Sequence, residues 1–306
     1  MSRPCITVKK YELNETALPP CELLSLVGER TGIVQRLYES YLERDDPEIY
    51  TYTLMQPHFE RMFKIEFELE FRAAAAGLSQ RDAMMRVFGE IAERYSMCFY
   101  YENEFRFATY NELEKGGVEA IGPDKLPLFT ETMYKTVKDF FEPFTKDSKL
   151  AWVEGISLTT RKPVLVPVQC VYAGYVPREG EIPLTYNMSN GCAASLSYEG
   201  ALLNAIYEVV ERDALMITWY SGLSPPRLDI SGCEWLSELR SHRFERGKIE
   251  YPLFYITLDI DIPIVLGMMI DWGRRDPMAM TGGACRLNPE DAAFKALLEA
   301  GQGRSY

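Results

Sequence analysis

The stretch SNGCAASLSYEGALLNAIYEVVERDA, residues 189–214, decides the fold. After its opening turn residues, the pattern predicts one long helix over about Tyr198 to Tyr220. Asn204, Glu208 and Glu211 then share one face, because residues at i, i+4 and i+7 stack along a helix. The helix is therefore predicted to present a polar stripe.

Two other stretches repeat this spacing. On an isolated helix, carboxylates three residues apart repel each other, so several such stripes indicate a cation between the helices. We predict a site for magnesium and nucleotide phosphate, with Glu90, Glu93, Glu208 and Glu211 as metal ligands. The two further sets are Ala83, Arg86, Glu90 and Glu93, and Ala292, Lys295, Glu299 and Gln302.

Three arginines follow the acidic positions, namely Arg94, Arg212 and Arg304. A guanidinium forms forked hydrogen bonds to phosphate oxygens, and we expect these arginines to hold the nucleotide. Ser189 and Asn190 are predicted to join them. The chain has no Gly-x-x-x-x-Gly-Lys-Ser/Thr loop, so side chains and metal must replace a phosphate-binding loop.

Each assignment has a simpler alternative. Glu90 and Glu93 could form a solvated helix face, with Arg86 pairing to Glu90. Ser189 and Asn190 could only turn the chain and cap a helix. A di-iron carboxylate site is disfavoured, because such sites use Glu-x-x-His and the chain has only two histidines, neither near a stripe.

Composition excludes several classes of protein. The chain has 306 residues, 47% hydrophobic, and can bury a substantial core. A net charge of -12 argues against a nucleic-acid or anionic-membrane surface. The N-terminus lacks an apolar signal segment, and seven scattered cysteines suit a reducing compartment. We therefore expect a cytoplasmic protein.

Strand patterns surround the three helices. Lys64 to Phe71 alternates apolar and acidic residues, and Ala73 to Gly77 then reads as a connection. Another predicted strand covers Met97 to Tyr101. Apolar runs at Tyr251 to Asp259 and Ile262 to Asp271 resemble a hairpin. The fold class expected is α+β, with mixed or antiparallel sheets flanked by helices, although a doubly wound parallel sheet would give a similar pattern.

Other strand and cap predictions complete the plan. Pro163 to Tyr175 is predicted as a strand, Ser79 with Asp82 as the cap of the first helix, and Asn288 with Pro289 as the start of the third. The expected domains are an N-terminal segment, 1–60, and a nucleotide-binding domain, 61–306, with insertions at about 102–150 and 221–250.

These motifs resemble the YcaO family. The run Ser189 to Ala194 with residues 201–214 is similar to its signature, and Glu90, Glu93 and Arg94 resemble its other nucleotide motif. Glu299-x-x-Gln302-x-Arg304 resembles the third, and Leu26 to Val34 resembles the N-terminal segment of cyclodehydratase members. The resemblance spans about Leu26 to Arg304 and implies a YcaO-like fold with an internal near-duplication centred on Glu90 and Glu208.

The resemblance implies an enzyme that uses ATP and Mg²⁺ to activate peptide backbone amides. In the family, a nucleophile adds to the amide carbonyl, the oxyanion accepts the γ-phosphoryl group, and phosphate leaves. The favoured reaction is cyclodehydration of cysteine, serine or threonine to azolines in a ribosomal precursor peptide; thioamide or amidine formation is the alternative. A leader-binding, E1-like partner protein is expected, and homodimerisation stays open.

Two departures from the family pattern favour a different hypothesis. The chain has Ala75-Ala76-Gly77 where members carry Gly-Lys-Gly, and Arg86 replaces an expected serine. Arg86 could contact phosphate, or neutralise Glu90 and leave a non-catalytic subunit that scaffolds a biosynthetic complex. The chain also stops soon after the third motif, where azoline-forming members continue, so we expect a C-terminally shortened chain or a fragment.

Overall fold

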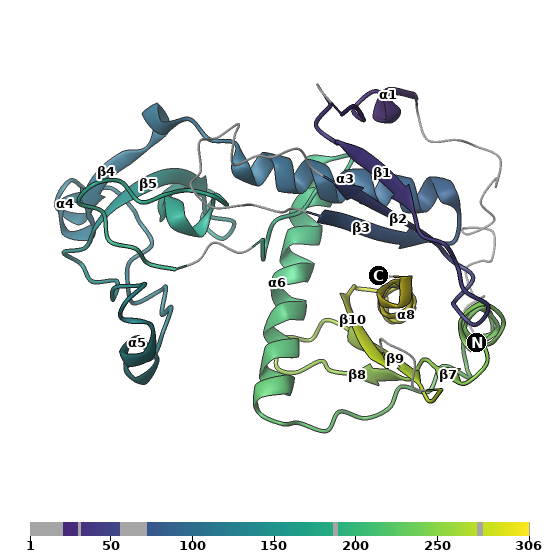
Figure 1. The fold of residues 1–306 in the computed structure, drawn as a ribbon. Coiled ribbons are helices and arrows are strands. Elements are labelled where there is room, and N and C mark those ends of the chain that lie inside the picture. The colour runs from purple at the N-terminus through teal and green to yellow at the C-terminus, as the bar shows by residue number, and fades with distance from the viewer. Residues whose placement is uncertain (1–20, 30–31, 56–71, 186–188, 274–277, 306) are drawn as a thin grey trace. The chain divides into compact units, whose positions relative to one another are not determined.

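The computed structural model of the chain describes residues 21–29, 32–55, 72–185, 189–273 and 278–305 (Figure 1). They form two compact units. Unit 1 holds the described residues up to Glu93 and from Asn190 onward, and unit 2 holds those from Arg94 to Ser189. The division thus falls inside the Glu-x-x-Glu-Arg run and inside the Ser-Asn-Gly loop.

Unit 1 contains two small antiparallel sheets. The first has the strand order β1-β2-β3, and the second has the order β10-β9-β7, with β8 also paired to β9. The strands are β1 (Arg36–Glu39), β2 (Tyr50–Met55), β3 (Arg72–Gly77), β7 (Ile249–Glu250), β8 (Leu253–Tyr255), β9 (Ile264–Asp271) and β10 (Ala279–Cys285).

Helices complete unit 1. They are α1 (Cys21–Leu24), the first part of α3 (Gln80–Cys98), α6 (Tyr198–Tyr220), α7 (Glu234–Leu239) with a π-helical turn (Arg240–Phe244), α8 (Pro289–Gln302) and a 3-10 turn (Gly303–Ser305). Helices α6 and α8 pack on opposite faces of the second sheet. Because side chains alternate along β9, Val265 and Met269 join the cluster around α8, whereas Ile264 and Leu266 join the cluster around α6.

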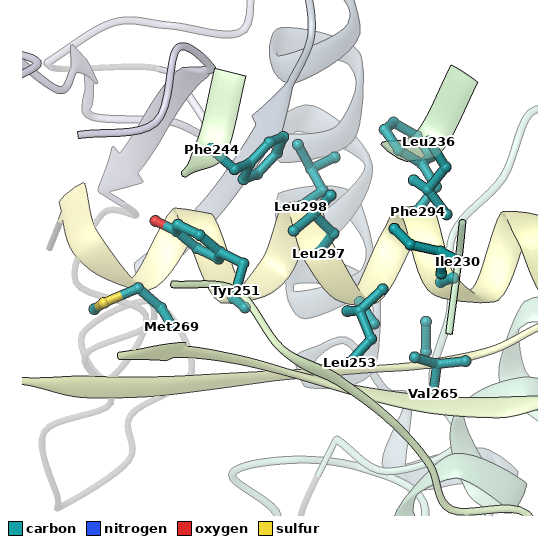
Figure 2. Packing of buried hydrophobic residues seen from close by; sticks show 14 of the residues in the cluster. Ile230, Leu236, Phe244, Tyr251, Leu253, Val265, Met269, Phe294, Leu297 and Leu298 are labelled. Atoms are coloured by element: carbon teal, nitrogen blue, oxygen red, sulfur yellow. The ribbon is translucent and has the colours of Figure 1, made fainter. Parts of the chain in front are cut away.

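Helix α8 forms the centre of the unit 1 core. Its Phe294, Leu297 and Leu298 lie between the sheet and the α7 region, as Figure 2 shows. A helix that is apolar on most faces must be buried on most faces, and the sheet and the α7 region together bury α8. Two glycines that face each other across β9 and β10 make the close packing feasible. A Cβ on Gly267 would lie 2.6 Å from the Ala296 carbonyl oxygen, and one on Gly282 would lie 2.4 Å from Ala300 N.

Helix α3 covers the first sheet. Ala83, Val87, Phe88 and Ile91 pack against residues of β2 and β3, including Tyr52 and Leu54. The predicted connection at Ala73 to Gly77 is wrong, because this segment is strand β3, paired along its length with β2. Its alanines have little β-propensity of their own, so the pairing and the helices around it decide the conformation.

Unit 2 has one antiparallel sheet, with the order β4-β5-β6. Its core contains Trp152, which is fully buried and donates its indole N–H to the Ala108 carbonyl at 2.9 Å. The elements are the end of α3, β4 (Arg106–Thr109), α4 (Tyr110–Lys115), α5 (Glu131–Val137), β5 (Lys149–Ile156), β6 (Pro163–Pro167) and 3-10 turns at Glu102–Glu104 and Val168–Cys170.

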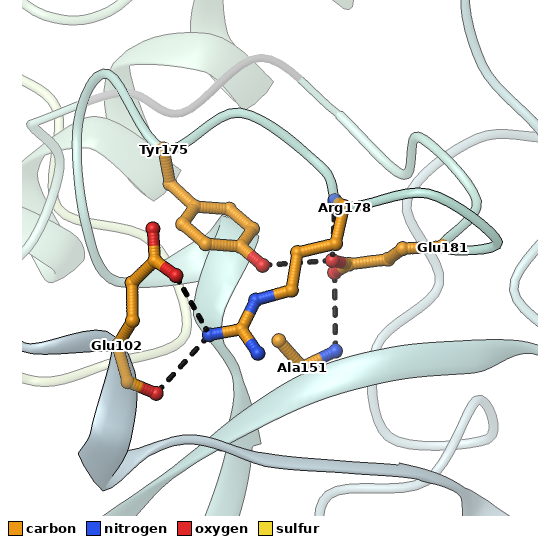
Figure 3. A network of polar contacts seen from close by, with 5 residues as sticks. All are labelled: Glu102, Ala151, Tyr175, Arg178 and Glu181. Carbon is orange, nitrogen blue, oxygen red and sulfur yellow. Dashed lines mark hydrogen bonds and ion pairs between the residues drawn. The ribbon is translucent and has the colours of Figure 1, made fainter. Parts of the chain in front are cut away.

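A buried carboxylate organises the loop after β6 in unit 2. Glu181 accepts hydrogen bonds from Tyr175 Oη at 2.7 Å, from Gln169 Nε2 at 2.9 Å and from the backbone N–H groups of Ala151 and Arg178, both at 3.1 Å. Figure 3 shows Arg178 reaching from the same loop to Glu102. With several donors, this carboxylate is satisfied within the fold and has a structural role.

The predicted α+β class is confirmed, and every strand ladder among the described residues is antiparallel, which rules out the doubly wound alternative. An antiparallel strand pair followed by a helix occurs twice in unit 1, as β2-β3-α3 and β9-β10-α8. We expected the near-duplication to centre on Glu90 and Glu208. The repeat seen here instead ends in the helices of Glu90 and Glu299.

Several predicted bounds need correction. The strand predicted at Met97 to Tyr101 is wrong, because α3 continues to Cys98 and residues 99–101 form no strand. The strand predicted from Pro163 ends at Pro167, where a 3-10 turn begins. The alternating segment Lys64 to Phe71 lies outside the described residues. No helix among the described residues is both long and apolar enough to cross a bilayer.

Segments predicted as insertions contribute to both cores. Residues 102–150 supply β4, α4 and α5, and place Leu113 and Phe144 in the core of unit 2. Residues 221–250 supply α7 and the π-helical turn, and place Leu236 and Phe244 in the core of unit 1. The boundary between a segment 1–60 and a domain 61–306 stays a prediction.

Candidate nucleotide and metal site

Helix α6 has the predicted bounds and orients the central motif. The side chain of Ser197 caps it by accepting a hydrogen bond from Gly200 N at 3.1 Å. One face, with Tyr207, Val210 and Ala214, packs on the second sheet. The polar stripe lies next to that face, because Glu208 follows Tyr207 and Glu211 follows Val210 by one position.

Glu208 is bound by the loop that precedes the helix. Its Oε2 accepts a hydrogen bond from Gly191 N at 3.1 Å, and its Oε1 lies 3.7 Å from Arg212 Nη2. Gly191 has φ +82, a left-handed conformation that other residues rarely adopt. This contact places the loop that follows Asn190 next to the polar stripe of α6, while the role of Asn190 in nucleotide binding stays a prediction.

Glu211 is the most buried carboxylate of the predicted set, with 7% of its surface exposed. Its Oε2 accepts a hydrogen bond from Cys285 N, at 3.2 Å, on strand β10. Burial first, and then the negative charge of Glu299, raise the pKa of this carboxyl, while Lys295 and Arg212 act in the opposite direction; the net result is a pKa of about 7. Carboxylates of α6 and α8 therefore act on each other electrostatically across the edge strand β10.

A glycine makes room for the carboxylate of Glu211. A Cβ on Gly283 would lie 2.9 Å from Glu211 Oε1, so a side chain there would displace the carboxylate. Gly282, next to it, admits the backbone of α8 from the other face, with 2.5 Å between its ideal Cβ and Glu299 Cβ. The Gly282-Gly283 pair thus lets both helices bring acidic residues to one strand, a role that our sequence reasoning missed.

The third motif lies on α8, which begins as predicted. Asn288 caps the helix by accepting from Glu290 N at 2.9 Å, and Pro289 occupies the first turn. Lys295 Nζ lies 3.2 Å from Glu299 Oε1. Gln302 Nε2 donates to the Ala74 carbonyl at 2.7 Å, which joins the end of α8 to strand β3.

The first motif lies on α3, which Ser79 caps by accepting from Asp82 N at 3.2 Å. The structure pairs Arg86 with Asp82, one turn earlier, at 2.9 Å between Nε and Oδ1. The hypothesis that Arg86 neutralises Glu90 loses its main support, because the guanidinium turns the other way. Glu90 and Glu93 are half-buried on the same helix, and their convergence with Glu208 and Glu211 stays a prediction.

Two predicted nucleotide contacts belong to unit 2. Arg94 Nη1 donates to Ser189 Oγ at 3.4 Å, although the two residues lie 95 positions apart in the chain. The arginine of the first motif and the serine of the Ser-Asn-Gly loop are therefore neighbours, as a shared ligand site requires.

Arg304 does not lie where a phosphate contact is expected. Only 3% of its side chain is exposed, and it forms ion pairs with Asp46 at 3.0 Å and with Asp271 at 3.4 Å. Tyr251, which is fully buried, lies in the field of the same three charges; burial raises its pKa, and so does Asp46. The guanidinium anchors the end of α8 to the segment before β2 and to the end of β9.

The donor set suits magnesium that arrives with a nucleotide. Within the part of the chain that the structure describes, no three acidic, histidine or cysteine side chains converge tightly enough to hold a metal ion alone. Mg²⁺ usually takes only one or two protein carboxylates and completes its octahedron with water and phosphate oxygens. Glu211 fits that demand, because a bound cation would stabilise the ionised form of this buried carboxyl, which burial and the charge of Glu299 disfavour.

The chain is similar in sequence to a longer protein, as the coverage of the two chains shows. A protein of Methanothermobacter thermautotrophicus, itself uncharacterized, is 28% identical over 236 residues, which cover 76% of this chain and 57% of that protein. The chain thus spans about half the length of this curated relative.

Two solved structures share the fold. A heterocyclase in complex with substrate and cofactor gives a TM-score of 0.76 at 22% identity, covering 92% of this chain and 39% of that one. The YcaO protein of Methanopyrus kandleri, bound with AMPPCP and Mg²⁺, gives a TM-score of 0.64 at 24% identity, covering 94% and 67%.

The family comparison covers the described motifs. The family model for the YcaO cyclodehydratase, described as ATP- and Mg²⁺-binding, matches residues 74–306, from β3 to the end of the chain. That description confirms the predicted cofactors at the level of the family. With its α+β fold, its three motif helices and this match over most of its length, the chain belongs to the YcaO family.

Proposed function

We propose that this protein uses ATP and Mg²⁺ to activate backbone amides of a ribosomal precursor peptide, most specifically to convert cysteine, serine or threonine residues into azolines. One observation carries the proposal: the glycine pair Gly282-Gly283 of β10 lets α8 and α6 place Glu299 and Glu211 against one strand, with Lys295 Nζ 3.2 Å from Glu299 Oε1. Phosphoryl transfer needs mainly positioning and neutralisation of charge, which such a cluster supplies.

The roles of the side chains follow from their chemistry. ATP would supply the phosphoryl group that turns the amide oxygen into a good leaving group. Glu208 and Glu211, with Glu90 and Glu93 of α3, would hold magnesium. Arg212 lies on the same helix turn as Glu208, 3.7 Å away, and is half exposed, so its guanidinium can reach phosphate oxygens.

The remaining polar residues would bind the nucleotide. Hydrogen-bond donors to the nucleotide would come from Arg94 of α3, Asn204 of α6, and Ser189 and Asn190 of the Ser-Asn-Gly loop. Glu299 and Gln302 would bind the nucleotide from α8. Arg304 contributes differently, by fixing the helix on which Glu299 and Gln302 lie.

The reaction we propose takes place in the cytoplasm, with a precursor peptide and a leader-binding, E1-like partner protein. The heterocyclase that shares this fold was solved in complex with substrate and cofactor. The non-catalytic alternative drew on Arg86 next to Glu90 and on the lysine missing before the first helix. Since Arg86 is held by Asp82, we favour the enzyme.

Calorimetry with AMPPCP, with and without Mg²⁺, tests the site directly. We expect binding that requires Mg²⁺, and we expect Glu208→Gln to weaken it by about 10- to 100-fold, because a charged metal ligand is lost. Glu199→Gln is the matched control, since Glu199 lies exposed on the first turn of the same helix.

Phosphate release with a candidate cysteine-rich peptide and its partner protein then tests the reaction, and mass spectrometry would detect one water lost per azoline. If the parent protein shows no Mg²⁺-dependent nucleotide binding, the proposed function is wrong. Binding without peptide-dependent phosphate release would instead favour the scaffold.

A further inference from the structure

Lys295 places an ammonium group at the carboxylate cluster. Its Nζ lies 3.2 Å from Glu299 Oε1, one helical turn further along α8. Its charge also acts on Glu211, the buried carboxylate of α6, in the direction that favours ionisation. One lysine thus interacts with acidic groups of two motif helices.

The pair differs from ordinary surface pairs in its position. The side chains of Lys295 and Glu299 are 29% and 36% exposed, whereas those of Lys146 and Glu114 in unit 2 are 51% and 55% exposed. Glu299 also adds negative charge to the surroundings of Glu211, a second carboxylate that is almost fully buried. A buried acidic group beside another negative charge needs a counter-ion even before a metal arrives.

Lysine suits an exchangeable counter-ion. Its ammonium is a compact charge on a flexible four-carbon stem, so it can turn from one oxygen partner to another without moving the backbone. Arg86 occupies the position in the first motif that Lys295 occupies in the third, but it pairs with Asp82 on the preceding turn of α3 and not with Glu90. Arg212 is paired to Glu208 on α6.

We propose that Lys295 is the built-in counter-ion of this site: it balances Glu299 and Glu211 while magnesium is absent, yields the carboxylates to the metal, and then contacts phosphate oxygens of the nucleotide. This inference rests on the proposed function. It requires opposite effects on the two ligands, because the ammonium repels free Mg²⁺ and attracts the triphosphate.

The test measures both ligands on the full chain. Binding of Mn²⁺ alone, followed by electron paramagnetic resonance, should become about three- to tenfold tighter in Lys295→Met, since a competing positive charge is gone. Binding of AMPPCP at saturating Mg²⁺ should become about five- to fiftyfold weaker. Lys295→Arg keeps the charge and should stay within about threefold of the parent for both ligands.

Lys146→Met is the matched control, because it removes the ammonium of another lysine–glutamate pair and should change neither affinity. Thermal denaturation verifies that each variant is folded. If Lys295→Met changes neither affinity, or shifts both in the same direction, the inference is wrong while the proposed function stands. If the parent binds neither probe, both are wrong.

Discussion

Replacing Gly283 with alanine tests whether β10 is shaped for the carboxylate of Glu211. The ideal Cβ at Gly283 lies 2.9 Å from Glu211 Oε1, and ordinary contacts begin at 3.4 Å, so the carboxylate must move by about 0.5 Å. The same movement would stretch the 3.2 Å hydrogen bond from Cys285 N to about 3.7 Å, beyond hydrogen-bonding range.

The expected cost falls on ligand binding. A misplaced charged acceptor costs about 1–2 kcal/mol, which corresponds to about a 5- to 30-fold weaker affinity for Mg²⁺–AMPPCP by calorimetry. Stability should change by less than about 1 kcal/mol, because the obstacle is the end of a side chain and the backbone at Gly283 does not have a left-handed φ.

Two further alanine variants make the result specific. Gly282→Ala places its Cβ 2.4 Å from Ala300 N, so it must displace α8 and should cost about 1–3 kcal/mol of stability by denaturant unfolding. Gly155→Ala in β5 meets nothing closer than 3.7 Å and should change neither quantity. Gly283→Ala with parental nucleotide affinity, or with the stability loss of Gly282→Ala, would refute the role given to this glycine.

The remaining predictions concern protons and buried charge. Because the folded pKa of Glu211 is about 7, above the ordinary 4.5, stability without metal should fall as pH rises from about 4.5 to about 7 and then level off. Mg²⁺–AMPPCP affinity should rise between about pH 6 and pH 8, and Glu211→Gln should abolish that rise; an unchanged profile would exclude Glu211 as the titrating ligand. Arg304→Met leaves Asp46 and Asp271 buried without their cationic partner and should lower the free energy of unfolding by about 3–5 kcal/mol in denaturant unfolding. Arg86→Met removes a partly exposed pair and should lower it by under about 1 kcal/mol. Equal losses would contradict the burial argument.

The motif helices were predictable because their determinants are local. Caps at Ser79 and Asn288, and apolar spacing along residues 198–220, fix where each helix starts and which face is buried. The three polar stripes follow from the same geometry. Sequence therefore indicated the helices and a candidate ligand set before any contact between them was known.

Other features depend on contacts between distant segments. Strand β3 has four alanines and was taken for a connection, but pairing with β2 imposes the strand and small side chains suit the nearby α8. Arg304 reads as a phosphate ligand in its motif, yet its partner Asp46 lies 258 positions away. The need for glycine at position 283 is visible only in the structure, where the carboxylate of Glu211 on α6 lies against it.

The central claim is that carboxylates of the motif helices, above all Glu208 and Glu211 of α6, hold the magnesium of a bound nucleotide. An anomalous difference map from crystals grown with Mn²⁺ and AMPPCP would test it most directly. We predict a metal peak at about 2.0–2.3 Å from a carboxylate oxygen of Glu208 or Glu211. A nucleotide-bound metal whose ligands include neither Glu208 nor Glu211 would contradict the claim.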